Sequence, residues 1–286
     1  SFFYVEPRLQ FNHELSETWS WQLGASMNSQ PLHDLVQAYG DYENESWVLA
    51  DGDTPPQHAQ QISSGLFGKL PGTTIDLSFE LYYKTMSNLL YLNPIGFDVN
   101  SIFDFLYKNG KGKSYGGEVL LKKSNGNFQW SLAYTLSASK RKFEGLNNGE
   151  WFNSDFDRRH DLNLGIHYYS GKKNVWNANY IFQTGRPFTM PLSQVAATSF
   201  YQRYYVIGDT NNAQMPNYKR FDIAYKHIGK IFWGRKVEYT FSVMNVFARK
   251  NPYSVYIKNN KLYMTSMYTV LPSVNIKIYT FKTNKQ

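Results

Sequence analysis

The sequence lacks several features that mark common protein classes. It contains no cysteine, which excludes a disulfide framework and a thiolate metal site. No run of about 18 apolar residues occurs, so a transmembrane helix is not expected. Lysine and arginine form no basic block, and the net charge of +8 gives little support to nucleic-acid binding. The architectures that a chain of this length can still form are one or two soluble domains or a single larger β architecture.

Catalytic and cofactor motifs are also missing. There is no Gly-x-Ser-x-Gly sequence and no phosphate-binding loop. The histidines show no zinc spacing. Asp51-Gly52-Asp53 lacks the later ligands of a calcium loop, and a plain turn is expected there. We therefore expect no cofactor, no metal and no catalytic residue.

Aromatic residues, in contrast, are abundant. The chain has 286 residues and 17% of them are Phe, Trp or Tyr. Aromatic girdles at membrane interfaces explain such an excess, and a large soluble β-propeller is the alternative. A propeller would show a repeat of about 40–50 residues, and none is visible. The mean hydropathy of −0.50 argues against a helical membrane protein, but it is compatible with a barrel whose strands are half polar.

The stretch 127–140 shows the pattern that recurs along the chain. Apolar side chains such as Trp130 and Tyr134 occupy one parity, and polar ones such as Ser131 and Thr135 occupy the other. Since side chains of a strand alternate between its faces, one face is apolar and the other polar. The strand exceeds the usual five or six residues and approaches the roughly ten needed to cross a bilayer.

Short and long connections between such strands alternate strictly. Turns are predicted at 13–17, 70–73, 123–126, 170–173 and 229–234. Long connections are predicted at 30–57, 87–113, 141–157 and 185–216, and an outward hairpin at 253–267. The stretch 30–57 is expected to be structureless, and the apolar patch 102–106 to be a short helix or an extra hairpin. About eleven spanning strands result, and we predict an all-β transmembrane antiparallel barrel with short periplasmic turns and long outer loops.

Several short motifs mark the ends of these strands. They are Glu6-Pro7-Arg8-Leu9, Tyr115-Gly116-Gly117-Glu118, Asp155-Phe156-Asp157-Arg158-Arg159-His160-Asp161-Leu162, Gln183-Thr184-Gly185-Arg186-Pro187, Pro216-Asn217-Tyr218-Lys219-Arg220-Phe221-Asp222, Asn245-Val246-Phe247, Lys250-Asn251-Pro252-Tyr253 and Leu271-Pro272-Ser273-Val274. In this order and spacing they resemble the carboxyl-terminal part of TonB-dependent outer-membrane receptors, particularly those of Bacteroidetes. The resemblance rests on the ordered set, which covers nearly the whole chain.

The resemblance implies a barrel of about 22 strands that encloses an amino-terminal plug domain. Residues 1–281 are then expected to form about half of the barrel, residues 282–286 a polar tail, and the plug to be absent from this chain. The family usually ends in an aromatic residue, whereas here Phe281 is followed by that tail. An open half-barrel would leave two unpaired edges in lipid, so the other strands are expected in an amino-terminal segment or another chain.

The resemblance also implies a function, a location and partners. It implies import of a siderophore, cobalamin, a saccharide or a peptide across the bacterial outer membrane, driven by TonB pulling on the plug. Expected partners are the remaining barrel and plug segment, TonB through the plug, lipid or lipopolysaccharide, and a surface lipoprotein. Two other functions stay open: a non-transporting barrel subunit of a larger complex, and an outer-membrane barrel hydrolase. We predict the importer and no enzyme.

Candidate site residues lie in the loops and on the polar face. Asp157, Arg158, Arg159 and Asp161 are predicted to form an ion network at the rim, with a hydrolytic Asp–His pair as the alternative. Trp47, Tyr201 and Tyr204 are candidates for stacking on a substrate, and they could equally form small cores within the loops. Polar residues expected to form a hydrated wall against the plug are Glu80, Glu118, Asn177, Asn179, Glu238 and Lys277.

Overall fold

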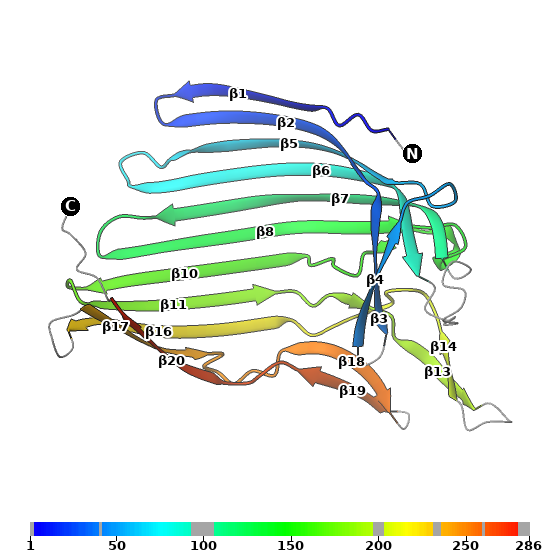
Figure 1. Ribbon diagram of the computed structural model, residues 1–286. Helices are drawn as coiled ribbons and strands as arrows, with labels where there is room; N and C mark the ends of the chain where they lie inside the picture. Colours follow the sequence, from blue (N-terminus) through cyan, green and yellow to red (C-terminus); the bar gives the residue numbers. More distant parts are fainter. Residues whose placement is uncertain are drawn as a thin grey trace.

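The computed structural model describes residues 3–39, 42–92, 106–196, 203–230, 236–258 and 261–279. Regular structure in these ranges is antiparallel strand, apart from one 3-10 turn at Asn147–Gly149 (Figure 1). None of the described residues forms a helix long and apolar enough to cross a membrane. The main sheet has twelve strands in the order β1-β2-β5-β6-β7-β8-β10-β11-β16-β17-β20, with β9 lying off this path against β8. The predicted fold class is confirmed.

The eleven strands of the main path are long and follow one another in chain order. Their bounds are β1 Arg8–Ser16, β2 Trp19–Gln30, β5 Gln57–Lys69, β6 Ile75–Leu92, β7 Leu106–Lys123, β8 Phe128–Lys142, β10 His160–Ser170, β11 Asn174–Gln183, β16 Tyr218–Lys230, β17 Lys236–Met244 and β20 Leu271–Ile278. At one end of the sheet the connections are short, and at the other end they are long. By the general architecture of outer-membrane barrels, the long connections mark the extracellular end.

The two faces of this sheet differ as the alternation predicts. Phe79 lies opposite Val119, and Val119 lies opposite Tyr134, so apolar side chains continue from strand to strand on one face. Phe79 and Phe241 are 37% and 49% exposed although they are large and apolar. An exposed apolar band of this kind on one face of a long sheet is the surface that lipid covers.

The long connections carry small sheets of their own. They form the pairs β3 (Leu32–Tyr39) with β4 (Tyr42–Leu49), β12 (Pro187–Phe188) with β15 (Ala213–Gln214), β13 (Pro191–Ala196) with β14 (Arg203–Ile207), and β18 (Pro252–Lys258) with β19 (Lys261–Ser266). The short β9 (Phe152–Asn153) pairs with the end of β8. In Figure 1 the β3–β4 hairpin runs across the direction of the main strands.

Two small apolar clusters hold these connections to the barrel wall. Leu35 and Val48 of the β3–β4 hairpin pack with Leu90 near the end of β6. The second cluster is made by Leu89, Phe143, Leu146 and Phe152. A side chain at Gly110 would collide with the ring of Phe143, so the ring lies directly on the backbone of β7. The loops are therefore packed by their own cores.

Three sequence expectations were wrong, for related reasons. The stretch 30–57 contains the β3–β4 hairpin, although it was expected to be structureless. The described part of the connection expected at 87–113 is strand, because β6 continues to Leu92 and β7 begins at Leu106. The turn expected at 13–17 is strand up to Ser16. Beyond the bilayer both faces of a strand meet water, so the alternation that reveals strands is lost there.

Other expectations have different outcomes. The outward hairpin expected at 253–267 is present as β18–β19. The patch at 102–106 lies outside the described residues except for Leu106, which begins β7. The polar tail at 282–286 also lies outside the described residues.

His33 of β3 is buried with an incomplete set of hydrogen bonds. The residue is 0% exposed, and its Nδ1 lies 3.0 Å from Nε2 of Gln57. Its Nε2 finds no hydrogen-bond partner within the described part of the chain. Burial lowers the pKa of His33 below its ordinary value of 6.5, because a charged imidazole would lose its hydration there. The docked hairpin therefore favours neutral His33.

We expect Phe143→Ala to loosen the extracellular connections selectively. Phe143 is 1% exposed, and removal of a buried Phe side chain costs about 3–5 kcal/mol. Hydrogen exchange should show the amides of 143–153 opening with a free energy lower by about 3 kcal/mol. Phe156→Ala, in the same connection but 56% exposed, is the matched control and should change little. Equal effects of the two variants would contradict this packing.

Acidification should release the β3–β4 hairpin. Since the pKa of His33 is lowered in the docked state, docking is fully stable above about pH 6.5. It should weaken as the pH falls below that value, because only the undocked hairpin takes up the proton readily. Amide protection factors of β3 and β4 at pH 7.5 and pH 5 measure this. His33→Gln should remove the pH dependence, and a dependence that survives would assign it to another group.

Candidate ligand-binding mouth and polar wall

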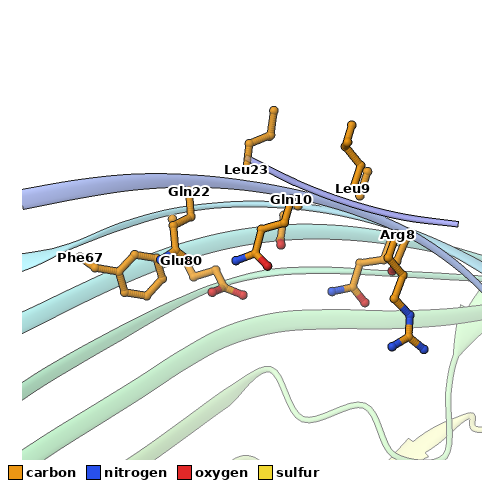
Figure 2. A pocket seen from close by; sticks show the side chains of 13 residues that line it. Arg8, Leu9, Gln10, Gln22, Leu23, Phe67 and Glu80 are labelled. Atoms are coloured by element: carbon orange, nitrogen blue, oxygen red, sulfur yellow. The ribbon is translucent and has the colours of Figure 1, made fainter. Parts of the chain in front are cut away.

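The polar face of the sheet forms a wall of charged and amide side chains. Figure 2 shows Arg8, Gln10 and Glu80 projecting from one side of the strands, whereas Leu9 and Leu23 project from the other. The polar side chains line a depression of about 380 Å³ on β1, β2, β5 and β6. Its walls are open at the edge of the sheet, so the face is a surface for a large partner and not an enclosed pocket.

Two acidic residues stand directly opposite each other on this wall. Glu80 of β6 is the register partner of Glu118 of β7. Neither carboxylate has an ion-pair partner in the described ranges. Like charges placed directly opposite on neighbouring strands destabilise a sheet. This point of the wall therefore suits a cationic group that the described residues do not supply.

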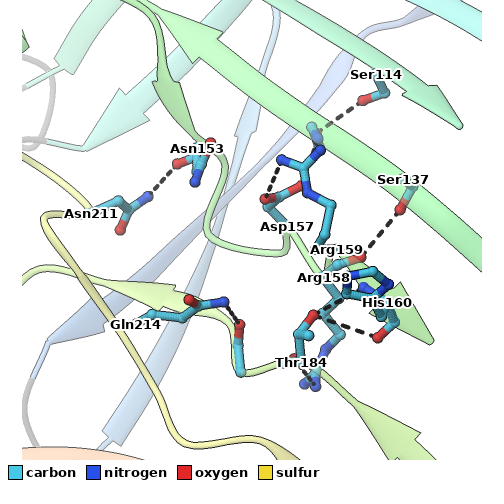
Figure 3. Close-up of polar contacts among 12 residues, drawn as sticks. Ser114, Ser137, Asn153, Asp157, Arg158, Arg159, His160, Thr184, Asn211 and Gln214 are labelled. Carbon is cyan, nitrogen blue, oxygen red and sulfur yellow. Dashed lines mark hydrogen bonds and ion pairs between the residues drawn. The ribbon is translucent and has the colours of Figure 1, made fainter. Parts of the chain in front are cut away.

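Three of the predicted rim residues, Asp157, Arg158 and Arg159, lie close together (Figure 3). Nη2 of Arg159 lies 4.0 Å from Oδ2 of Asp157. Arg158 donates to the backbone carbonyl of Thr184 at 3.4 Å. Its guanidinium is half buried, and burial together with the nearby Arg186 lowers the pKa of Arg158. Asp161 accepts a hydrogen bond from Nε2 of Gln183 at 2.7 Å. The rim is thus held mainly by hydrogen bonds to backbone and amide groups.

The alternative of a hydrolytic Asp–His pair finds no support in this geometry. Nδ1 of His160 lies 2.8 Å from the hydroxyl of Tyr134, and the two rings stack. The carboxylate of Asp157 accepts the backbone N–H of Ser139 at 2.6 Å. His160 and Asp161 alternate along β10 and so project from opposite faces. No described histidine of this cluster is oriented by a carboxylate, as a general base would be.

A second polar cluster, centred on Asp155, lies where the long connections meet. Oδ1 of Asp155 accepts from the hydroxyl of Tyr91 at 3.3 Å and from Nδ2 of Asn211 at 3.0 Å. Nη1 of Arg141 lies 3.5 Å from Oδ2 of the same residue. The group borders a cavity of about 200 Å³ that also includes Asp34 of β3. It presents charge and hydroxyl groups to the mouth of the wall.

Asparagine links two long connections into one unit. Nδ2 of Asn147 donates to the carbonyl of Thr210 at 2.9 Å, and the N–H of Thr210 donates to Oδ1 of Asn147 at 2.7 Å. Nδ2 of Asn211 donates a hydrogen bond to the backbone carbonyl of Asn153 at 2.8 Å (Figure 3). Both Asn147 and Asn211 have positive φ, a conformation that Asn tolerates better than most residues.

Side chains also replace ladder hydrogen bonds where strands leave the sheet. Asn217 Oδ1 accepts the N–H of Gly185 at 3.2 Å, and Asn251 Oδ1 accepts the N–H of Lys219 at 2.9 Å. At Gly185 a side chain would collide with the backbone carbonyl oxygen of Met215. The glycine of the Gln183–Pro187 motif is therefore required by a backbone contact.

The predicted loop aromatics are placed unequally. Trp47 of β4 is 59% exposed, and its register partner Asp34 lines the cavity of the Asp155 cluster. Tyr204 belongs to β14, where its backbone pairs with Val195. Tyr201 lies outside the described residues. Of the three, Trp47 is the one whose side chain is seen free to contact a ligand.

Sequence reasoning missed Tyr91 and Arg141 as members of the Asp155 cluster. Both lie at strand ends beyond the alternating stretch, and their partners are 64 and 14 residues away in sequence. The described residues contain no group of three or more His, Cys, Asp or Glu side chains that could hold a metal ion. The mouth and wall are suited to noncovalent binding.

Comparison with known proteins identifies the family. The sequence matches the family model described as TonB dependent receptor-like, beta-barrel, over residues 1–246. No curated protein matches the chain.

Several solved structures share the fold. The ferric-catecholate import receptor Fiu from Escherichia coli K12 aligns with a TM-score of 0.58 and 13% identity, over 95% of this chain and 34% of Fiu. BauA, the ferric preacinetobactin receptor from Acinetobacter baumannii, aligns with a TM-score of 0.58 and 12% identity, over 96% of this chain and 36% of BauA. FpvAI in its complex with pyocin S2 aligns with a TM-score of 0.59 and 15% identity, over 96% of this chain and 32% of FpvAI.

At these identities the likeness concerns the fold alone, and the chain spans about a third of the length of each of these proteins. The family match covers most of the chain and agrees with the two-faced antiparallel sheet. The chain therefore belongs to the TonB-dependent receptor-like β-barrel family, whose members are outer-membrane receptors and transporters and not enzymes.

Proposed function

We propose that this chain forms the carboxyl-terminal half of the barrel of a TonB-dependent importer, of the Bacteroidetes type that its motifs resemble. The observation that carries the proposal is the open, two-faced sheet of the main path. In lipid each unpaired backbone group costs several kcal/mol, so both edges of the sheet require further strands. Residues 1–281 belong to this half-barrel, and 282–286 form a polar tail.

Strand direction limits what can close the barrel. All neighbouring strands of the main path are antiparallel, and their number is odd, so β1 and β20 run in the same direction. Pairing β1 with β20, within one chain or between two copies, would make a parallel seam. A closed antiparallel barrel needs an even number of strands. The missing part must therefore supply an odd number, and eleven would complete the barrel of about 22 that the resemblance implies.

A plug domain is the partner that we assign to the polar wall. The wall is open, polar and too extended for a small molecule, and Glu80 and Glu118 face each other there without a described cation. A basic side chain of the plug placed between them would turn a repulsion into two ion pairs. TonB, acting through the plug, is the proposed source of energy.

The substrate enters at the mouth formed by the long connections. Its proposed contacts are Trp47, Tyr201 and Tyr204, together with the Asp155 cluster. Fiu, BauA and the FrpB iron transporter from Neisseria meningitidis are named for iron or ferric ligands. We therefore place ferric chelates first among the candidate substrates, ahead of cobalamin, saccharides and peptides. A surface lipoprotein would be a further partner at this mouth.

Nutrient uptake tests the proposal directly. Deletion of the full-length gene should abolish growth on one of the four substrate classes, and disruption of TonB should have the same effect. Trp47→Ala should weaken binding of that substrate about tenfold, since an exposed aromatic ring contributes stacking area without being needed for packing. Phe247→Ala, 75% exposed at another connection, is the control. Uptake that persists without TonB would leave a structural barrel subunit as the better description.

Removal of the facing carboxylates should loosen the plug. In the full-length protein, Glu80→Gln with Glu118→Gln removes the charges that we assign to plug contact. Ion conductance through the receptor in planar bilayers should rise several-fold, because charge-assisted hydrogen bonds are replaced by weaker neutral ones. Glu144→Gln with Glu150→Gln, both exposed in the connection after β8, changes the charge equally and should leave conductance low. An unchanged conductance in the first variant would place the plug elsewhere.

A further inference from the structure

Four lysines gather on the apolar face of the sheet, at its extracellular end. Lys111 lies opposite Lys142, and Lys113 lies opposite Lys140, on neighbouring strands β7 and β8. The regular register continues from these pairs to the pair of Val119 and Tyr134 without a break. The residue numbers of the lysines and of these apolar residues on the same strand differ by an even number, so their side chains project from the same face. This lysine patch therefore lies outside the barrel and not in its lumen.

The lysine patch has no anionic counterpart among the described residues. None of the four ammonium groups forms an ion pair with a carboxylate of the described residues. Nζ of Lys113 instead lies 4.2 Å from the ring centre of Trp151, a cation–π contact that holds this ammonium group in place. Two directly opposed pairs of like charge destabilise the sheet unless an anion lies between them.

A depression adjoins the patch on the same face. Its volume is about 420 Å³, and its lining includes His58, Gln60, Tyr83, Lys111, Lys113 and Trp151. His58 and Gln60 share the parity of Ile62, whose register partner is Tyr83 on the apolar face. The depression therefore offers hydrogen-bond donors, positive charge and aromatic rings to a molecule outside the barrel.

The height of the patch matches the membrane surface. On β8 the apolar parity runs from Phe128 to Ala138, which is about 34 Å along the strand. At a tilt of about 45° this spans roughly the 25 Å of the apolar band of an outer-membrane barrel. Tyr83 and Tyr115, stacked with ring centres 6.3 Å apart, lie at the upper edge of the band. Lys113 and Lys140 come two residues beyond that edge, at the level of lipid headgroups.

We propose that the lysine patch and its depression bind the phosphate groups of a lipid in the outer leaflet. The ligand is amphiphilic: its phosphates lie between the paired lysines, and its acyl chains cover the exposed apolar residues below, such as Leu81 and Phe79. A soluble anion would use the charges but not the apolar surface that is continuous with them. The inference concerns the outside of the wall, so it is independent of which substrate crosses the lumen.

Titration of the full-length protein with a phosphorylated glycolipid tests this site. Native mass spectrometry of the protein in detergent measures the apparent Kd for monophosphoryl lipid A. Lys113→Gln with Lys140→Gln should weaken binding about 25-fold, at roughly fivefold for each lysine near an anionic headgroup. Lys172→Gln with Lys173→Gln, at the opposite end of the barrel, changes the charge equally and should weaken binding less than twofold.

Further arms separate lipid from free anion and from misfolding. Dephosphorylated lipid A should bind at least tenfold more weakly than the monophosphorylated form, and millimolar inorganic phosphate should not displace the lipid. Heat-dependent gel migration shows whether each variant forms a barrel. If the variant Lys113→Gln with Lys140→Gln does not fold, the variant Lys111→Gln with Lys142→Gln is measured in its place. Equal affinity of the patch and control variants would overturn the proposal. Displacement of the lipid by inorganic phosphate would overturn the assignment to a lipid headgroup.

Discussion

The need to pair every backbone N–H and C=O group in hydrocarbon governs this structure. Within the membrane the pairing comes from an unbroken ladder, and its register is set by the alternation of apolar and polar side chains. A slip by one residue would turn Tyr134 toward water and Thr135 toward lipid, so the pattern specifies one register. The same requirement makes the two edges that stay unpaired among the described strands the strongest indication that more strands belong to the barrel.

Outside the membrane the same groups are satisfied in another way. As strands diverge, Asp157, Asn217 and Asn251 accept backbone N–H groups that have lost their ladder partners. The rim residues that the sequence suggested as an ion network serve in large part this purpose. Their density is explained by the geometry of diverging strands, and charge pairing contributes little in so hydrated a place.

The alternation allowed the sequence to predict the fold class, the spanning strands and the order of short and long connections. The site was less accessible, for a physical reason. Asp155 collects Tyr91 from the end of β6, Arg141 from the end of β8 and Asn211 from the connection after β11. No periodicity links residues that meet only through the folding of these segments. The β3–β4 hairpin was missed because, beyond the bilayer, neither face of a strand has to be apolar. The sequence also predicted an odd number of spanning strands. That β1 and β20 therefore cannot close an antiparallel barrel by pairing with each other became clear only from the directions of the paired strands.

The double hydrogen bond between Asn147 and Thr210 has an evolutionary consequence. Surface loops of receptors usually diversify independently, since each can lengthen without disturbing its neighbours. Here the segment after β8 and the segment after β11 are joined by these two hydrogen bonds, so a change of sequence or length in one segment is constrained by the other. Diversification in response to new ligands or to attack from outside would be easier at exposed side chains such as Trp47 and Leu49, which take no part in these hydrogen bonds. The mouth thus combines a conservative side with a variable one.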